Sequence, residues 1–205
     1  MRSVQGAIAS LSERYIALFV EDYAHQKVIG TLVQRVASEY GIEVRLDWRS
    51  AMGGHGKVIV ELKNYMRDLN RQGTPWPDLI VVATDANCKG LNERSREIGD
   101  LDAPAPVLLA IPDPHVERWL LLDGAAFKEV FGRGCQAPDR KCSRERYKEL
   151  LIEEIHAAGG TPILGGIEYA EDIVRQMDID RAARADDALR RFVENLRSIV
   201  RGWRG

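Results

Sequence analysis

The order of strand-like and helix-like segments predicts an α/β fold with a largely parallel sheet. Short apolar runs rich in β-branched residues occupy positions 15–20, 79–83 and 106–111, and such runs are typical of strands buried on both faces. Segments with helical spacing separate these runs, which is the alternating order of an α/β protein with right-handed crossovers. The 205 residues leave room for one large domain, or one domain with an appendage.

The first half of the chain alternates clearly between strand and helix. After the strand at 15–20, apolar residues recur at helical spacing over 24–40, and Gly41 then ends the helix. Residues 42–48 alternate apolar and charged side chains, which is the pattern of a strand at a sheet edge. The strand at 79–83 is the most apolar of the set, so we expect it to be central.

The glycine-rich stretch at 51–57 precedes a helix predicted over 58–70. A glycine-rich turn before a helix can present N–H groups to phosphate, but the spacing matches no nucleotide-binding motif, and a flexible connection explains it equally well. A short polar helix at 91–98, the strand at 106–111 and a helix at 116–122 complete the alternating part.

The last third of the chain changes character. Helices are predicted at 143–158, with Ser143 as the N-cap, at 167–177 and at 187–200, separated by loops rich in glycine and proline. We therefore expect an α/β core over residues 1–125 and a helical extension over 126–205 that packs on it.

The composition is that of an ordinary globular protein, with 45% apolar and 29% charged residues. A net charge of −2 argues against a strongly basic nucleic-acid coat, although it leaves room for a local basic groove. Three cysteines without paired spacing predict neither a disulfide framework nor a zinc site. No apolar run is long enough to span a membrane, and we expect a reducing, cytoplasmic environment.

Acidic and metal-capable residues follow three of the predicted strands. Because parallel strands place their carboxyl ends at one edge of a sheet, we expect these residues to share a cleft. Carboxylates in one place repel each other unless a cation neutralises them, and Mg²⁺ or Mn²⁺ held by carboxylates, waters and phosphate oxygens supports phosphodiester chemistry. The residues are Glu21, Asp85, Asn87, Asp113, His115 and Glu117.

Each of these residues also has an ordinary structural use. Asp85 could cap a helix, Asn87 could stabilise a turn, and Glu117 could interact with a helix dipole. Asp113 stands between two prolines and could rigidify a turn. The basic residues Lys57, Lys89 and Arg94 follow the same strand ends, where they could contact nucleic-acid phosphates or remain solvated surface charges.

Three motifs resemble the TOPRIM domain of topoisomerases, bacterial primases and nucleases of the OLD family. They are FVED with Glu21, TDAN with Asp85 and Asn87, and PDPHVERWLLLD with His115 and Glu117. The last motif is similar to that of small, standalone TOPRIM-like proteins of mobile elements and phage-defence loci. The resemblance covers about residues 14–125. The chain departs from the family's pattern at Asp22, where glycine is usual, and at Asn87, which replaces a second Asp.

The resemblance implies a TOPRIM-like, parallel-rich sheet flanked by helices, with additional C-terminal helices. It also implies a Mg²⁺- or Mn²⁺-dependent nuclease, acting on DNA or RNA in a defence system with an ATPase partner. Glu21, Asp85 and Glu117 would hold metal, with Asn87, Asp113 or His115 completing the site.

Two other functions remain open from the sequence. The fold could be a non-catalytic metal- or nucleotide-binding module that regulates an ATPase, which Asn87 favours because it removes a charge. A different α/β phosphohydrolase could use Asp22 as nucleophile, although the usual second Asp two residues later is missing.

Overall fold

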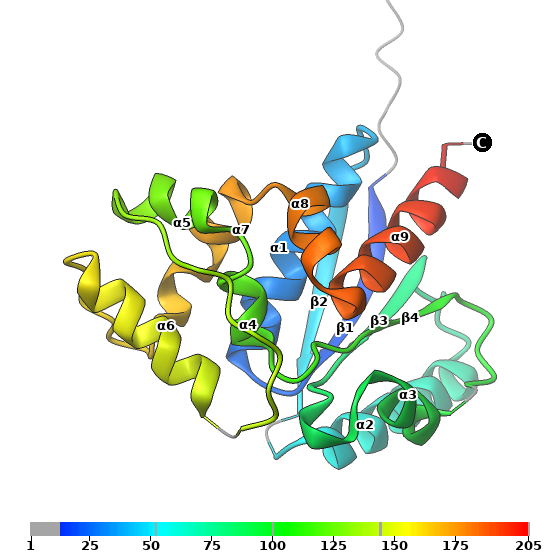
Figure 1. Cartoon of the computed structure of the whole chain (residues 1–205). Coiled ribbons are helices and arrows are strands. Elements are labelled where there is room, and N and C mark those ends of the chain that lie inside the picture. The colour runs from blue at the N-terminus through cyan, green and yellow to red at the C-terminus, as the bar shows by residue number, and fades with distance from the viewer. Residues whose placement is uncertain (1–12, 52, 100, 144, 205) are drawn as a thin grey trace, which may run out of the picture.

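The computed structural model describes residues 13–51, 53–99, 101–143 and 145–204. Its centre is a four-stranded parallel sheet with the strand order β2-β1-β3-β4, which confirms the predicted α/β class (Figure 1). As expected, the alternating strand lies at an edge and the most apolar strand lies inside the sheet. The strands are β1 (Arg14–Val20), β2 (Val44–Ser50), β3 (Leu79–Ala83) and β4 (Val107–Ala110).

Helices cover both faces of this sheet, and each face packs into an apolar cluster of its own. Ile16 and Leu18 of β1 belong to the cluster under α1 (Tyr23–Glu39). The alternate residues Ala17 and Phe19 belong to the cluster under α2 (His55–Gln72) and α3 (Leu91–Ile98). Burial on both faces explains why the central strands are apolar at every position.

The remaining helices extend the layer formed by α1 (Figure 1). Their apolar side chains join the cluster on the α1 face of the sheet, so one core includes residues from both sides of position 125. Helix α5 crosses that position, and residues 1–12 of the expected core lie outside the described part of the chain. These helices are α4 (Val116–Leu120), α5 (Gly124–Phe131), α6 (Arg146–Ala157), α7 (Ala170–Gln176), α8 (Ile179–Ala185) and α9 (Asp187–Gly202).

Some helix boundaries differ from those expected. Ser143 is not the cap of α6, which begins after Glu145 in a left-handed conformation at φ 65°. The segment at 167–177 divides into a 3₁₀ turn, η2 (Ile167–Tyr169), and α7. The helices α5 and α8 were not predicted, because seven or eight residues provide too little periodicity to recognise.

The connections of the sheet create a switch point between β1 and β3. Strand β1 continues through α1 to β2 on one side, whereas β3 continues through α3 to β4 on the other. In open α/β sheets, the crevice beyond the carboxyl ends of two such strands is where ligands bind. Within the described residues, no helix is long and apolar enough to cross a membrane.

Candidate functional site

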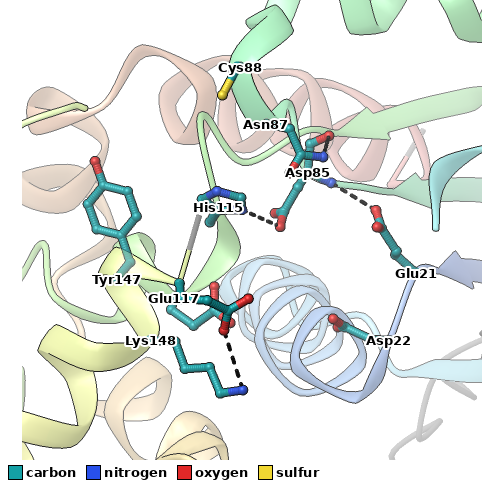
Figure 2. Close-up of a pocket in the computed structure, with 10 residues that line it drawn as sticks. Glu21, Asp22, Asp85, Asn87, Cys88, His115, Glu117, Tyr147 and Lys148 are labelled. Carbon is teal, nitrogen blue, oxygen red and sulfur yellow. Dashed lines mark hydrogen bonds and ion pairs between the residues drawn. The ribbon is translucent and has the colours of Figure 1, made fainter. Parts of the chain in front are cut away.

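A pocket of about 570 Å³ opens at this switch point (Figure 2). We call it the acidic pocket, because five carboxylates line it: Glu21, Asp22, Asp85, Glu117 and Glu145. Asn87 and His115 also line it, so the structure brings together most of the residues predicted from the strand ends. These residues come from the ends of β1 and β3, the start of α4 and the region around α6.

Glu21 joins the ends of the two central strands. Its backbone N–H donates to the carbonyl of Ala83, 3.2 Å away. Its Oε2 accepts hydrogen bonds from the Thr84 hydroxyl at 2.6 Å and from the Asp85 backbone N–H at 3.3 Å. The carboxylate that follows β1 is therefore held against the backbone of Asp85, which follows β3, as Figure 2 shows.

Asp85 is the most densely contacted carboxylate of the pocket. Its Oδ1 accepts from the Val116 backbone N–H at 2.9 Å and from His25 Nε2 at 3.1 Å, and its Oδ2 lies 2.9 Å from His115 Nδ1. Burial alone would raise the pKa of Asp85, but the charge of His25 and the hydrogen bond from His115 lower it. Asp85 is therefore held as a carboxylate.

His25 links two carboxylates across the floor of the pocket. Its Nδ1 lies 2.8 Å from Asp22 Oδ1 and its Nε2 lies 3.1 Å from Asp85 Oδ1. Since ionised carboxylates only accept, both ring nitrogens must donate, which requires the imidazolium form. Burial would lower the pKa of His25, but the charge of Asp85 and the bonds to both carboxylates raise it well above the usual value.

His115 and Glu117 lie at the start of α4, where β4 leads into the pocket. The hydrogen bond from Nδ1 to Asp85 raises the pKa of His115 and leaves Nε2 as the nitrogen that can exchange a proton. Burial and the nearby charge of Asp85 raise the pKa of Glu117. A base and an acid of different strength thus occur in one pocket, which is the usual requirement for proton transfer.

Asn87 takes a structural role as well as a place in the pocket. It adopts a left-handed backbone at φ 51°, a conformation that Asn tolerates better than most residues. Its backbone N–H donates to the Pro114 carbonyl at 3.0 Å, and its side-chain amide lies 3.5 Å from the Asp85 carbonyl. The turn after β3 is thereby joined to the turn after β4.

Asp113 is not among the residues that line the acidic pocket. Its Oδ2 lies 3.5 Å from Arg140 Nη1, in a separate hollow on the other side of the turn. The expectation that Asp113 helps to complete the metal site is therefore not met by this arrangement. In the sequence Asp113 and His115 are only two positions apart, but the turn directs them to different surfaces.

The predicted phosphate-binding residues occupy different environments. Arg94 is only 6% exposed, because its guanidinium donates to the Asp85 carbonyl at 3.0 Å and to Glu97 at 2.7 Å. Its assignment as a nucleic-acid contact is wrong, and it supports the turn that carries Asp85. Lys89 is exposed and pairs with Glu97, and Lys57 is exposed near the start of α2.

A disulfide bond connects Cys88 to Cys142 beside the acidic pocket, with 5.3 Å between the Cα atoms. The expectation of unpaired cysteines is wrong, because the partners are 54 positions apart and only the fold brings them together. The bond holds the segment that precedes α6. That helix contributes Tyr147 and Lys148 to the pocket, and Lys148 pairs with Glu145 at 3.6 Å.

The sequence reasoning missed His25, Tyr147 and Lys148. His25 had a usable signal, because an Asp three residues before a His at a predicted helix start is the spacing of an N-cap, and Asp22 does accept from the His25 backbone N–H at 3.0 Å. Nothing local indicates Tyr147 or Lys148, since α6 reaches the pocket only through tertiary packing.

Protein ligands for a divalent cation at this site would come from the carboxylates of the acidic pocket. Among the residues that the structure describes, no group of three or more His, Cys, Asp or Glu side chains converges on one point. Mg²⁺, however, is commonly held by one or two carboxylates together with waters and substrate phosphates. Glu21 and Glu117 both line the pocket, and a cation bound there would offset the burial and the charge of Asp85 that raise the pKa of Glu117.

The geometry defines the class of protein as an α/β protein with an acidic pocket at the switch point of its parallel sheet. Comparison of the chain with protein-family models, curated proteins and solved structures finds no match. The site residues themselves are therefore the basis for assigning a function.

Proposed function

We propose that this protein is a Mg²⁺- or Mn²⁺-dependent enzyme that cleaves phosphodiester bonds of DNA or RNA. The observation that carries the proposal is the gathering of Glu21, Asp85 and Glu117 around one pocket at the switch point of the sheet. Oxygen ligands of this kind suit a hard divalent cation, and the resemblance of their three motifs to TOPRIM proteins agrees with that chemistry.

Glu21 and Glu117 would hold the cation, which when bound would supply charge stabilisation for the reacting phosphate. Asp85 has a different part, because its oxygens already accept from three donors of the protein. It orients His115 through Nδ1, so that Nε2 can take the proton of an attacking water. Glu117 is ionised when it holds the cation, so the leaving oxygen takes its proton from solvent.

The direct test is hydrolysis of labelled DNA and RNA by the purified chain in Mg²⁺, in Mn²⁺ and in EDTA. We expect cleavage in either metal and none in EDTA. Glu117→Gln should abolish most cleavage and weaken Mg²⁺ binding measured by calorimetry, whereas Glu129→Gln, an exposed carboxylate on α5, should change neither. Cleavage in EDTA, or full activity of Glu117→Gln, would contradict the proposal.

One observation favours a second function, a non-catalytic module that regulates a partner ATPase. Asp85 is already neutralised by His25 and His115 without any cation, and Asn87 supplies no second charge beside it. A binding module would take up metal or nucleotide in the same pocket without turnover. Saturable binding in calorimetry, combined with no cleavage of any nucleic acid, would favour this function.

The proposal also includes a partner and a location. A net charge of −2 provides little general attraction for nucleic acid, so we propose that an ATPase partner presents the substrate. We propose a cytoplasmic location from the sequence, and the Cys88–Cys142 bond counts against a strongly reducing compartment. Binding by the isolated chain should then be weak and sensitive to salt, and should strengthen when the partner is added. Tight binding by the chain alone that does not respond to salt would contradict this part.

A further inference from the structure

Two adjoining hollows of about 310 and 240 Å³ lie beside the acidic pocket, and both are lined by Arg140 and Asp187. We call them together the basic hollow. Their lining contains five cationic side chains, in contrast to the single lysine of the acidic pocket. The cations are Lys89, Arg118, Arg140, Arg184 and Arg191.

The basic hollow is formed by several segments that are far apart in the sequence. Arg191 of α9 donates from Nη1 to Asn92 Oδ1 of α3 at 3.2 Å. Arg140, in the segment before α6, lies 3.5 Å from Asp113 in the turn after β4. Tertiary contacts therefore place these cations together, and no run of basic residues in the sequence indicates the surface.

The positive charges of the hollow are not fully neutralised. Its three carboxylates each have a cation: Asp113 has Arg140, Asp186 has Arg118, and Asp187 has Arg190 at 2.9 Å. Among the described residues, Arg184 makes no hydrogen bond or ion pair, although its charge contributes to lowering the pKa of Asp180. Arg191 hydrogen-bonds only a neutral amide, and its charge contributes to lowering the pKa of Asp187. Arg118, itself 5% exposed, also keeps an Nε N–H without a partner in the described structure. The unmatched groups are thus donors and positive charges.

The hollow borders the acidic pocket, because neighbouring residues of the same turns line the two sites. Cys88 lines the pocket and the next residue, Lys89, lines the hollow. His115 lines the pocket, and Asp113 lines the hollow. A nucleic-acid strand that crosses this boundary would meet carboxylates on one side and arginines on the other.

We propose that the basic hollow binds the sugar–phosphate backbone of nucleic acid adjacent to the bond that is cleaved, which rests on the proposed function of the acidic pocket. Arginine pairs well with phosphate, and contacts of this type set the position of a strand without reading its sequence. The hollow would hold the substrate against the repulsion of the carboxylates. Arg184 and Arg191 are the principal contacts, since no carboxylate pairs with either.

The test measures binding of labelled single- and double-stranded DNA and RNA to the full chain by fluorescence anisotropy in EDTA, where no cleavage interferes. We expect Arg184→Gln combined with Arg191→Gln to weaken binding by about tenfold, and to reduce the slope of log Kd against log salt by about one per arginine. The matched control is Arg201→Gln combined with Arg204→Gln, which removes the same two charges from exposed positions at and just beyond the far end of α9.

Three outcomes would overturn the proposal. The first is an unchanged Kd for the double variant, and the second is an equal loss of affinity in the control. The third is found with a labelled polyglutamate peptide as an additional probe: if the double variant loses affinity for this peptide but not for nucleic acid, the hollow binds an acidic protein instead. The two proposals fail separately. If the wild-type chain does not cleave nucleic acid but binds it through the two arginines, only the function of the acidic pocket is refuted. If the chain cleaves nucleic acid but its binding does not depend on the two arginines, only the role of the basic hollow is refuted.

Discussion

The acidic pocket and the basic hollow lie next to each other but balance their charges in different ways. In the acidic pocket, the excess of carboxylates is reduced from within, because the buried His25 imidazolium lies between Asp22 and Asp85. In the basic hollow, each carboxylate is paired and the excess is positive, with Arg184 outside any pair in the described structure. The first site thus keeps an excess of carboxylates and the second an excess of arginines, which is the basis for proposing a cation in one and phosphate in the other.

Under the proposed function, this difference would allow a chain with a net charge of −2 to bind nucleic acid. Net charge describes long-range attraction, whereas binding depends on which charges are neutralised locally. The following predictions test the comparison, beginning with the largest expected effect.

Asp85→Asn should reduce metal-dependent cleavage by at least about 100-fold, because a neutral amide cannot accept from both histidines and the Val116 N–H or hold His115 in its tautomer. Steady-state cleavage rates measure the effect, and a thermal melt shows whether the variant folds. Asp102→Asn, at an exposed carboxylate, serves as control. Wild-type activity in Asp85→Asn would show that this residue is not part of the chemistry.

His25→Gln should destabilise the protein by about 3–5 kcal/mol, because it leaves buried carboxylate charge uncompensated. Since the pKa of His25 is raised on folding, its stabilisation is fully present below the unfolded value of about 6.5 and is lost as the pH rises through the folded pKa. Urea unfolding in EDTA from pH 6 to 9 measures this. The difference between wild type and variant should narrow at high pH, and a constant difference would refute a charged His25.

Breaking the Cys88–Cys142 bond should cost about 2–4 kcal/mol, because the bond closes a long loop and restricts the unfolded chain. Cys88→Ser should also loosen the segment before α6, which borders both the pocket and the hollow. Urea unfolding with and without reductant, together with hydrogen exchange over residues 136–148, measures these effects. Reductant should not change the Cys88→Ser variant. Cys135→Ser removes the unbonded cysteine and should retain the response to reductant.

Mg²⁺ should stabilise the chain modestly, by about 1.4 kcal/mol when its concentration is ten times Kd. For a chain of this size, that corresponds to a rise in Tm of about 3–6 °C. Glu117→Gln should remove most of this rise, and Arg184→Gln should keep it, because the cation belongs to the acidic pocket alone. An equal loss of the rise in both variants would refute the separation of the two sites.

Local pattern was enough to predict several features of this protein. The apolar runs of β1, β3 and β4 predicted parallel strands buried on both faces, and the acidic groups after them predicted the residues that now line one pocket. Such predictions succeed because strand periodicity and the position of a residue after a strand are properties of neighbouring residues. The expectation for Asp113 failed because a two-residue turn decides which surface a side chain reaches.

The tertiary structure alone decided which distant groups meet. It placed His25 against Asp85, bonded Cys88 to Cys142, buried Arg94 beneath the turn after β3, and gathered Arg184 with Arg140. Each of these contacts joins segments through the strand order β2-β1-β3-β4 and the packing of α6, α8 and α9. Charge pairing and disulfide formation depend on separations of a few ångströms in space, and no spacing along the chain encodes those separations.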